Sequence, residues 1–291
     1  MGYAIRTAAL FMMLTFIFMG IGAVIWYIFM YYGYFDGTIN SLLLMMLVFI
    51  VLASLLNLFS FLFSKKIVLR AHKVKIIRRE ENPRLYNIVE GIARQGNLPM
   101  PQVGVTNNPT PNAFATGRGP KNAAVVATTG LLAMLDDREL RGVMAHEMAH
   151  VKNRDILVMS VAATVAGAIS IMARFAIFAS LGNNRNNGAM IVVAILAYIT
   201  IPIAAMLIQL GISRGREYKA DESGAKMIND PVALANALDK LENGNIARPM
   251  VNEGLTHAHM WIANPFGGKR KGGASLFSTH PPMAERIRRL N

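Results

Sequence analysis

The chain opens with two long runs of apolar residues, and no charged side chain interrupts either run. Thr7 to Phe35 is rich in Leu, Ile, Phe and Met, and Ile39 to Phe63 follows a short turn that carries Asp36. Each run exceeds the roughly 20 residues that a helix needs to cross a bilayer. A cleaved signal peptide would have a shorter apolar core and a small-residue cleavage site, and neither is evident. The pattern therefore predicts a transmembrane hairpin.

A second pair of apolar runs lies further along the chain, from Ile156 to Leu181 and from Ala189 to Ile212. An Asn-rich turn separates the two runs, which predicts a second membrane hairpin. Arg174 interrupts the first of them, and an arginine is costly in the middle of a bilayer. A hydrophobic hairpin partly buried in a soluble domain is therefore the alternative interpretation.

Composition agrees with a membrane protein, and the charges predict its orientation. Hydrophobic residues make up 53% of the 291 positions and the mean hydropathy is +0.36, which is not typical of a simple soluble protein. The net charge is +13, and basic residues cluster directly after the first hairpin, between Lys65 and Arg79. By the positive-inside rule this side of the membrane is cytoplasmic, together with the N-terminus. A nucleic-acid surface is the competing interpretation, but the cluster lacks interleaved aromatic residues.

Between the two hairpins the pattern is that of a soluble segment with helices and short strands. It predicts a helix over residues 83–95 and strands over 99–106, 112–117 and 123–128. One of these strands could pair with an extended peptide substrate and recognise its backbone. The residues in question are Asn112, Ala113, Phe114 and Ala115. An ordinary hairpin that supports the neighbouring helix is the alternative.

The candidate chemistry lies in the next predicted helix. A capping box formed by Asp136 and Glu139 marks the start of this helix. This helix contains a His-Glu-x-x-His motif. His146 and His150 fall one turn apart on one face, so both imidazoles can reach one metal ion, while Glu147 points elsewhere and can act on a water molecule. The chain has no cysteine, so histidines and carboxylates must supply any metal ligands. The alternative is a chance pentapeptide on an ordinary helix.

A third ligand is predicted after the second hairpin. That hairpin returns the chain to its starting side, so a helix containing Glu217 and Asp221 comes close to the two histidines. Glu217 can complete a two-histidine, one-carboxylate site of the kind that hydrolytic zinc requires. Asp221 lies one turn further on the same face and can accept the outer N–H of a ligand histidine. Taken alone, both residues would be read as solvated surface charges.

The C-terminal region predicts an amphipathic helix over residues 230–241 and a short basic helix over 285–289. His280 precedes two prolines and could donate a hydrogen bond to a developing oxyanion, or it could have a structural role alone. His257 and His259 are two residues apart and would not share a helix face, so we interpret them as loop residues.

Together these motifs resemble those of HtpX-type membrane zinc metalloproteases, a family related to the CAAX prenyl proteases. The matching motifs lie at residues 111–117, 146–155, 216–221 and 278–282, and the order of motifs and apolar runs fits over Thr7 to Leu290. The resemblance implies one zinc ion per chain, held by His146, His150 and Glu217, with Glu147 as the catalytic acid–base. It also implies a role in membrane protein quality control under stress, on misfolded or damaged membrane proteins, in possible cooperation with other proteases.

The predicted fold class is a mainly α integral membrane protein with four transmembrane helices and a cytoplasmic α+β zinc metallopeptidase domain containing a small sheet. The predicted divisions are a first membrane hairpin at 1–64, a catalytic segment at 65–155, a second membrane hairpin at 156–212 and a second catalytic segment at 213–291. We expect both termini and the active site on the cytoplasmic side of the cell (inner) membrane. The expected partners are polypeptide substrates and the lipid bilayer, without nucleic acid.

Two other functions are compatible with the sequence. A CAAX-type protease would reveal itself by prenyl-dependent cleavage. A transporter or an inactive scaffold would make the His-Glu-x-x-His motif incidental. Transporters usually place charged residues near the membrane midplane, whereas the ligands here are predicted at cytoplasmic helix ends. A scaffold predicts no bound metal and no loss of function when Glu147 is changed.

Overall fold

The structure is a computed structural model that describes residues 3–31, 33–162, 164–165, 214–247, 262 and 281–291. The described residues up to Phe63 form one packing unit, and those of Ser64–Thr164 together with those from Arg214 onward form a second. Most of the predicted second membrane hairpin lies outside the described residues, as do His257, His259 and His280.

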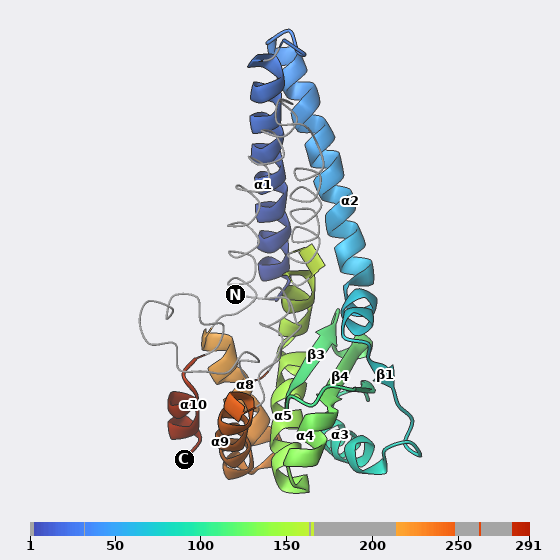
Figure 1. Cartoon of the computed structure of the whole chain (residues 1–291), viewed down its shortest axis with the longest axis vertical. Coiled ribbons are helices and arrows are strands. Elements are labelled where there is room, and N and C mark those ends of the chain that lie inside the picture. Colours follow the sequence, from blue (N-terminus) through green and yellow to red (C-terminus); the bar gives the residue numbers. More distant parts are fainter. Residues whose placement is uncertain (1–2, 32, 163, 166–213, 248–261, 263–280) are drawn as a thin grey trace. The chain divides into compact units, whose positions relative to one another are not determined.

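The first unit contains a helical hairpin of α1 (Tyr3–Tyr31) and the part of α2 (Ile39–Ala71) up to Phe63, shown in blue in Figure 1. Both helices are long and apolar enough to cross a membrane. In the most apolar 18-residue stretch of each helix, only 17% of the residues of α1 and 6% of those of α2 are buried. A core helix of a soluble protein would instead be mostly buried. The predicted helical hairpin is confirmed. Helix α2 extends beyond the predicted apolar run and includes Lys65, Lys66 and Arg70.

Polar contacts join the two helices of this hairpin. The side-chain amide of Asn57 donates to the carbonyl of Phe11 and to the hydroxyl of Thr15, at 3.3 Å each. Nearer the turn, the indole N–H of Trp26 donates to the hydroxyl of Ser41 at 2.9 Å. Such interhelical hydrogen bonds hold apolar helices together where water does not drive their association.

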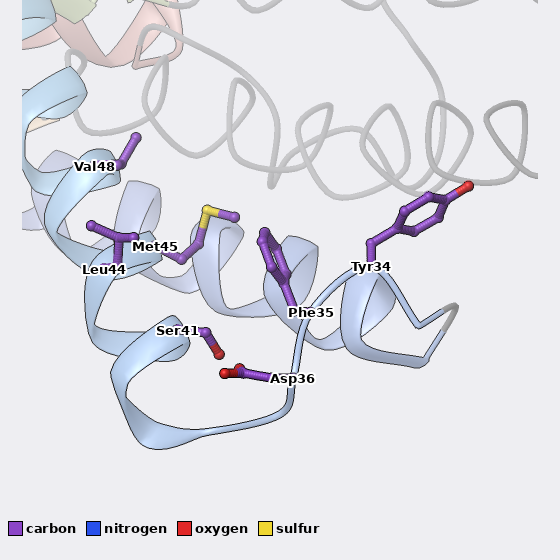
Figure 2. Close-up of a pocket in the computed structure, with 7 residues that line it drawn as sticks. All are labelled: Tyr34, Phe35, Asp36, Ser41, Leu44, Met45 and Val48. Carbon is purple, nitrogen blue, oxygen red and sulfur yellow. The ribbon is translucent and has the colours of Figure 1, made fainter.

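An open pocket of about 490 Å³ lies at the turn of the hairpin. Figure 2 shows the side chains of Asp36 and Ser41 facing each other, with Phe35 and Met45 also lining the pocket. The Asp36 carboxylate accepts hydrogen bonds from the backbone N–H and the hydroxyl of Thr38, which lower its pKa. This carboxylate therefore orders the start of α2, and the residues lining the pocket include none of the predicted metal ligands.

A four-stranded mixed sheet forms part of the described second unit. Its strands are β1 (Lys75–Ile76), β2 (Gln102–Thr106), β3 (Ala113–Gly117) and β4 (Ala123–Thr128), in the order β1-β2-β4-β3. Strand β4 is parallel to β2 and antiparallel to β3. The predicted strands at 112–117 and 123–128 are confirmed. The strand predicted at 99–106 begins only at Gln102, because Pro99 and Pro101 have no N–H for a ladder.

Helix α5 occupies the centre of this unit, with the sheet on one side and α8 and α9 on the other (Figure 1). Its buried apolar face includes Leu140, Val143 and Met148, which recur at helical spacing. The helix predicted at 83–95 is confirmed as α3, which also packs on α5. The helical elements of this unit that the structure describes are α3 (Pro83–Gln95), the 3₁₀ turn η1 (Pro120–Asn122), α4 (Thr129–Met134), α5 (Asp137–Asn153), α8 (Arg214–Ile228), α9 (Pro231–Ala247) and α10 (Met283–Leu290).

Two glycines allow α8 and α9 to approach α5 closely. A Cβ atom on Gly142 would come within 2.7 Å of the backbone of Leu234 in α9. A Cβ atom on Gly224 in α8 would lie 2.9 Å from the backbone of Ala145 and His146. Real Cβ atoms do not make contacts this short, so only glycine permits these separations. The second contact brings α8 against the turn of α5 that carries His146.

Candidate metal centre

The helix that carries the His-Glu-x-x-His motif begins and ends as its local chemistry requires. The carboxylate of Asp136 accepts from the backbone N–H of Glu139 at 2.9 Å, and the Glu139 side chain accepts from the backbone of Asp136 at 3.0 Å. This confirms the predicted capping box. The helix ends at Arg154, which adopts a left-handed conformation with φ of 60°. The motif therefore lies inside a 17-residue helix that is capped at both ends.

Three candidate ligand atoms converge at one buried point. His146, His150 and Glu217 each offer one atom, and these atoms lie within 4.8 Å of one another. The Nε2 atoms of the histidines are 3.2 Å apart, and Glu217 places Oε1 3.4 Å from Nε2 of His150 and Oε2 3.7 Å from Nε2 of His146. Ligands about 2.0–2.1 Å from a tetrahedral zinc are separated by about 3.4 Å. The donor types and their spacing therefore fit such an ion.

A carboxylate lies beside the outer nitrogen of each histidine, and the one beside His146 is the closer. Nδ1 of His146 lies 2.8 Å from Oδ1 of Asp221, and Nδ1 of His150 lies 3.5 Å from Oδ2 of Asp155. An acceptor at Nδ1 places the proton there and leaves Nε2 as the lone-pair donor. The sequence predicts this relation for Asp221. It does not predict that Asp155 lies near His150. The carboxylate of Asp155 comes there because the residue stands just after the end of α5.

Arg286, from the C-terminal helix α10, is the residue of this centre that sequence reasoning missed. Its guanidinium is fully buried and binds both oxygens of Asp221, with Nε at 2.8 Å and Nη2 at 2.7 Å. A signal for it exists in the sequence. Met283, Arg286, Ile287 and Leu290 share helical i, i+3, i+4, i+7 spacing, which places an arginine on the apolar face.

The local charges act differently on the two histidines. Burial alone lowers the pKa of His150, but the facing carboxylates of Asp155 and Glu217 outweigh it and raise the pKa to about 10. For His146 burial prevails and lowers the pKa, because Arg286 and His150 offset the carboxylate of Asp221. The carboxylates of Asp155 and Glu217 that favour positive charge at His150 would also attract a divalent metal ion to its Nε2 atom.

Glu147 is buried next to the ligands. Burial in a poorly hydrated site raises the pKa of its carboxyl group to about 8, and the neighbouring charge of Glu217 adds to this. His150, Arg286 and the backbone of Ala115 act in the opposite direction. A carboxyl group with a pKa close to neutral can both accept and release a proton during a reaction.

Of the residues predicted to bind a substrate, Asn112 directly precedes β3 and the other three lie on β3, at one edge of the described sheet. Asn112, Ala113, Phe114 and Ala115 are all buried. The backbone N–H of Ala113 donates to the side-chain oxygen of Asn112, and its carbonyl accepts from the backbone N–H of Ile262 at 3.1 Å. Pairing of a peptide with β3 remains a prediction, and the contact with Ile262 means that the Ala113 carbonyl is already engaged.

The chain is similar to known membrane-associated proteases over most of its length. The model of "Peptidase family M48" matches residues 79–291. A protease HtpX homolog of Thermococcus sibiricus is 45% identical over 100% of this chain and 96% of its own length. A protease HtpX homolog of Persephonella marina is 48% identical, covering 82% of this chain and 84% of the relative. The match to the Thermococcus sibiricus relative spans the whole chain, so it includes both the hairpin region and the region of the metal centre.

Among solved structures, that of S. mikatae Ste24p is similar to this chain with a TM-score of 0.50 and 17% sequence identity. The similarity covers 94% of this chain and 62% of Ste24p. At this level of identity the similarity concerns the fold. It supports a helical fold with a small mixed sheet and with helices suited to a membrane.

Proposed function

From the premise that this chain belongs to peptidase family M48, we propose that it is a zinc-dependent endopeptidase with Glu147 as its acid–base. Family membership and the HtpX homologues make the chain a membrane metalloprotease, a hydrolase of peptide bonds with a metal cofactor. The identity of the metal as zinc, one ion per chain, and the ligand roles of His146, His150 and Glu217 belong to the proposal.

One observation carries the proposal. Two imidazole nitrogens and one carboxylate from two separate helices meet within 4.8 Å, in the interior of the protein and beside a buried glutamate. Buried ionisable groups that lack a function are disfavoured, because each loses its hydration. Two histidines with one glutamate form the ligand set of hydrolytic zinc sites that keep one position open for water.

Different residues of the site have different roles in hydrolysis. When bound, zinc lowers the pKa of water and polarises the carbonyl of the scissile bond. Glu147 takes the proton from the attacking water and then passes it to the leaving amine. Asp221 and Asp155 keep His146 and His150 oriented with Nε2 towards the ion. The buried surroundings exclude bulk water, which strengthens each of these charge interactions.

The proposal extends to location and substrates. Basic residues between Lys65 and Arg79 support a cytoplasmic position for the catalytic unit under the positive-inside rule. With the predicted second hairpin at 156–212 the chain would cross the cell (inner) membrane four times. Misfolded or damaged membrane proteins are then the polypeptides within reach, which fits a role in quality control. The likeness to Ste24p is one of fold and carries no proposal of prenyl-protein cleavage.

The test compares the wild type with Glu147→Gln and with Glu222→Gln, all purified in detergent under chelation and then supplied with zinc. Glu222 is an exposed glutamate on α8 and serves as a matched control. We expect about one zinc per chain in all three proteins. Casein cleavage should fall about 100- to 10,000-fold in Glu147→Gln and stay unchanged in Glu222→Gln. Cleavage retained by Glu147→Gln would reject the acid–base assignment, and a wild type without zinc would reject the metal site.

A further inference from the structure

Arg286 makes contacts in several directions from one buried position. Its Nε and Nη2 atoms bind the two oxygens of Asp221, and its Nη1 donates to the carbonyl of Ile262 at 2.9 Å. The same guanidinium lies 3.5 Å from Nδ1 of His146 and 3.9 Å from the carboxylate of Glu217. A single side chain of α10 thus contacts a candidate ligand, its orienting carboxylate and a residue bound to β3.

We propose that Arg286 is a positioning residue that holds Asp221 against His146 and so sets the direction in which His146 presents its Nε2 to the metal. This inference rests on the metal site proposed above. Arg286 acts through Asp221, and we assign it no contact with substrate or with the reacting atoms. It links the C-terminal helix to the metal centre.

The geometry of the forked guanidinium group explains why an arginine is suited to this role. A guanidinium can bind both oxygens of a carboxylate at once, which fixes the rotation of the carboxylate plane. With Asp221 fixed in this way, its Oδ1 remains 2.8 Å from Nδ1 of His146. An aspartate without such a partner could rotate about its side-chain bonds and lose that contact. Because Arg286 lies on a different helix from Asp221, the restraint is tertiary.

A second contact restrains Arg286 itself. The carbonyl of Ile262 accepts from Nη1 of Arg286, and the backbone N–H of Ile262 donates to the carbonyl of Ala113 on β3. The guanidinium is therefore held from the side of the sheet and from the side of α8. A fully buried arginine is costly unless its charge and its donors are matched. Here the oxygens of Asp221 and Ile262 provide that match.

Other arginines on the same helix lack this environment. Arg288 and Arg289 are exposed, and both form ion pairs with Glu285 within α10. Arg288 has the same charge and helix as Arg286, but its described contacts are local. It therefore serves as the matched control for a substitution of Arg286.

The test measures zinc affinity by competition with a chelator, together with the unfolding temperature of the metal-free and the zinc-loaded protein. The variants are Arg286→Gln, Arg286→Lys, Asp221→Asn, the double variant Asp221→Asn/Arg286→Gln, and Arg288→Gln as control. We expect Arg286→Gln to bind zinc about 10- to 100-fold more weakly, as loss of a group that orients a ligand does. Arg286→Lys should fold and show a smaller loss, because an ammonium keeps the positive charge beside Asp221 but cannot bind both of its oxygens as a guanidinium does.

Asp221→Asn should weaken zinc binding to a similar degree. The double variant should lose little more than either single variant, because both substitutions remove the same restraint. Arg288→Gln should bind zinc as the wild type does. A purely structural role predicts lower unfolding temperatures with unchanged zinc affinity in both Arg286 variants, and that result would overturn the inference. If Arg286→Gln does not fold, the affinity of Arg286→Lys decides. A wild type that binds no zinc would instead refute the proposed metal site.

Discussion

The two units of this chain distribute polar and apolar side chains in opposite ways. On α1 and α2, large apolar residues such as Phe16, Leu44 and Leu55 are more than half exposed, at 68%, 63% and 59%. In the second unit, charged residues such as Glu217 and Arg286 are buried, at 3% and 0%. The first distribution suits hydrocarbon as the surrounding solvent, and the second suits a bound cation in the interior.

The comparison shows what stabilises each arrangement. In the hairpin the few polar groups pair across the helices, as Asn57 does with Phe11 and Thr15. In the metal centre the charges are close to one another, and a loss of any one leaves another buried and unmatched. Changes in the metal centre should therefore have larger effects than changes in the hairpin.

The largest effect is expected from Glu217→Gln, which removes the negative charge of the third candidate ligand. A neutral amide is a much poorer zinc ligand than a carboxylate, so we expect zinc affinity to fall about 100-fold or more. Chelator competition measures this directly. Glu222→Gln on the same helix is the control and should bind zinc normally. Unchanged affinity in Glu217→Gln would exclude Glu217 as a ligand and leave its burial unexplained.

A second prediction concerns the close approach of α8 to α5. In Gly224→Ala the new methyl group meets the backbone of Ala145 and His146, so α8 must move. We expect a loss of about 1–3 kcal/mol in unfolding free energy together with weaker zinc binding. Gly91→Ala on α3 is the control, because nothing lies near its Cβ position and the residue is exposed. That change should stabilise the protein by up to about 1 kcal/mol. Equal effects of both substitutions would contradict this view of the packing.

A smaller effect is expected in the hairpin. Asn57→Leu removes both hydrogen bonds to α1 and leaves an apolar side chain of similar size. The expected loss is about 0.6 kcal/mol, typical of an interhelical hydrogen bond in a membrane. Thermal unfolding in detergent measures it, with Ser54→Ala as the control, since the Ser54 hydroxyl bonds within α2 itself. A loss as large as that of Gly224→Ala would remove the contrast between the units.

The smallest effect is expected at an ion pair on the surface of the second unit. Arg138 on α5 binds Asp230 through two hydrogen bonds of 2.7 and 2.8 Å, and this pairing lowers the pKa of Asp230 below 3.8. Because the folded-state pKa lies below the unfolded one, the contribution is present above pH 3.8 and is lost as the pH falls further. Asp230→Asn should cost at most about 1 kcal/mol at pH 7. Its difference in unfolding temperature from the wild type should shrink on acidification, and a constant difference would contradict the ionic origin.

Much of this architecture follows from local sequence signals. Each of these signals lies within one continuous segment of the chain. Examples are the capping box of Asp136 and Glu139, the strand patterns of β3 and β4, and the apolar length of α1 and α2. The convergence of Glu217 with the two histidines was predicted from the return of a hairpin, and the structure does place these groups together. The metal-binding roles themselves remain predictions.

What the sequence did not yield depends on contacts between distant residues. Arg286 is separated by 65 positions from its partner Asp221, and its burial depends on the packing of α10 against α8 and α9. The short strand β1 forms because β2 offers it an antiparallel partner, with Lys75 opposite Val105. The approach of Asp155 to His150 requires the chain to turn back at Arg154. No local pattern specifies such pairings.

The most direct test of the central claim is zinc K-edge X-ray absorption of the purified, zinc-loaded protein. The account predicts stoichiometric zinc with a shell of nitrogen and oxygen ligands that includes the scattering signature of two imidazoles, from His146 and His150. His150→Ala should reduce that signature to one imidazole. Absence of stoichiometric zinc, or a shell without imidazole, would contradict the account.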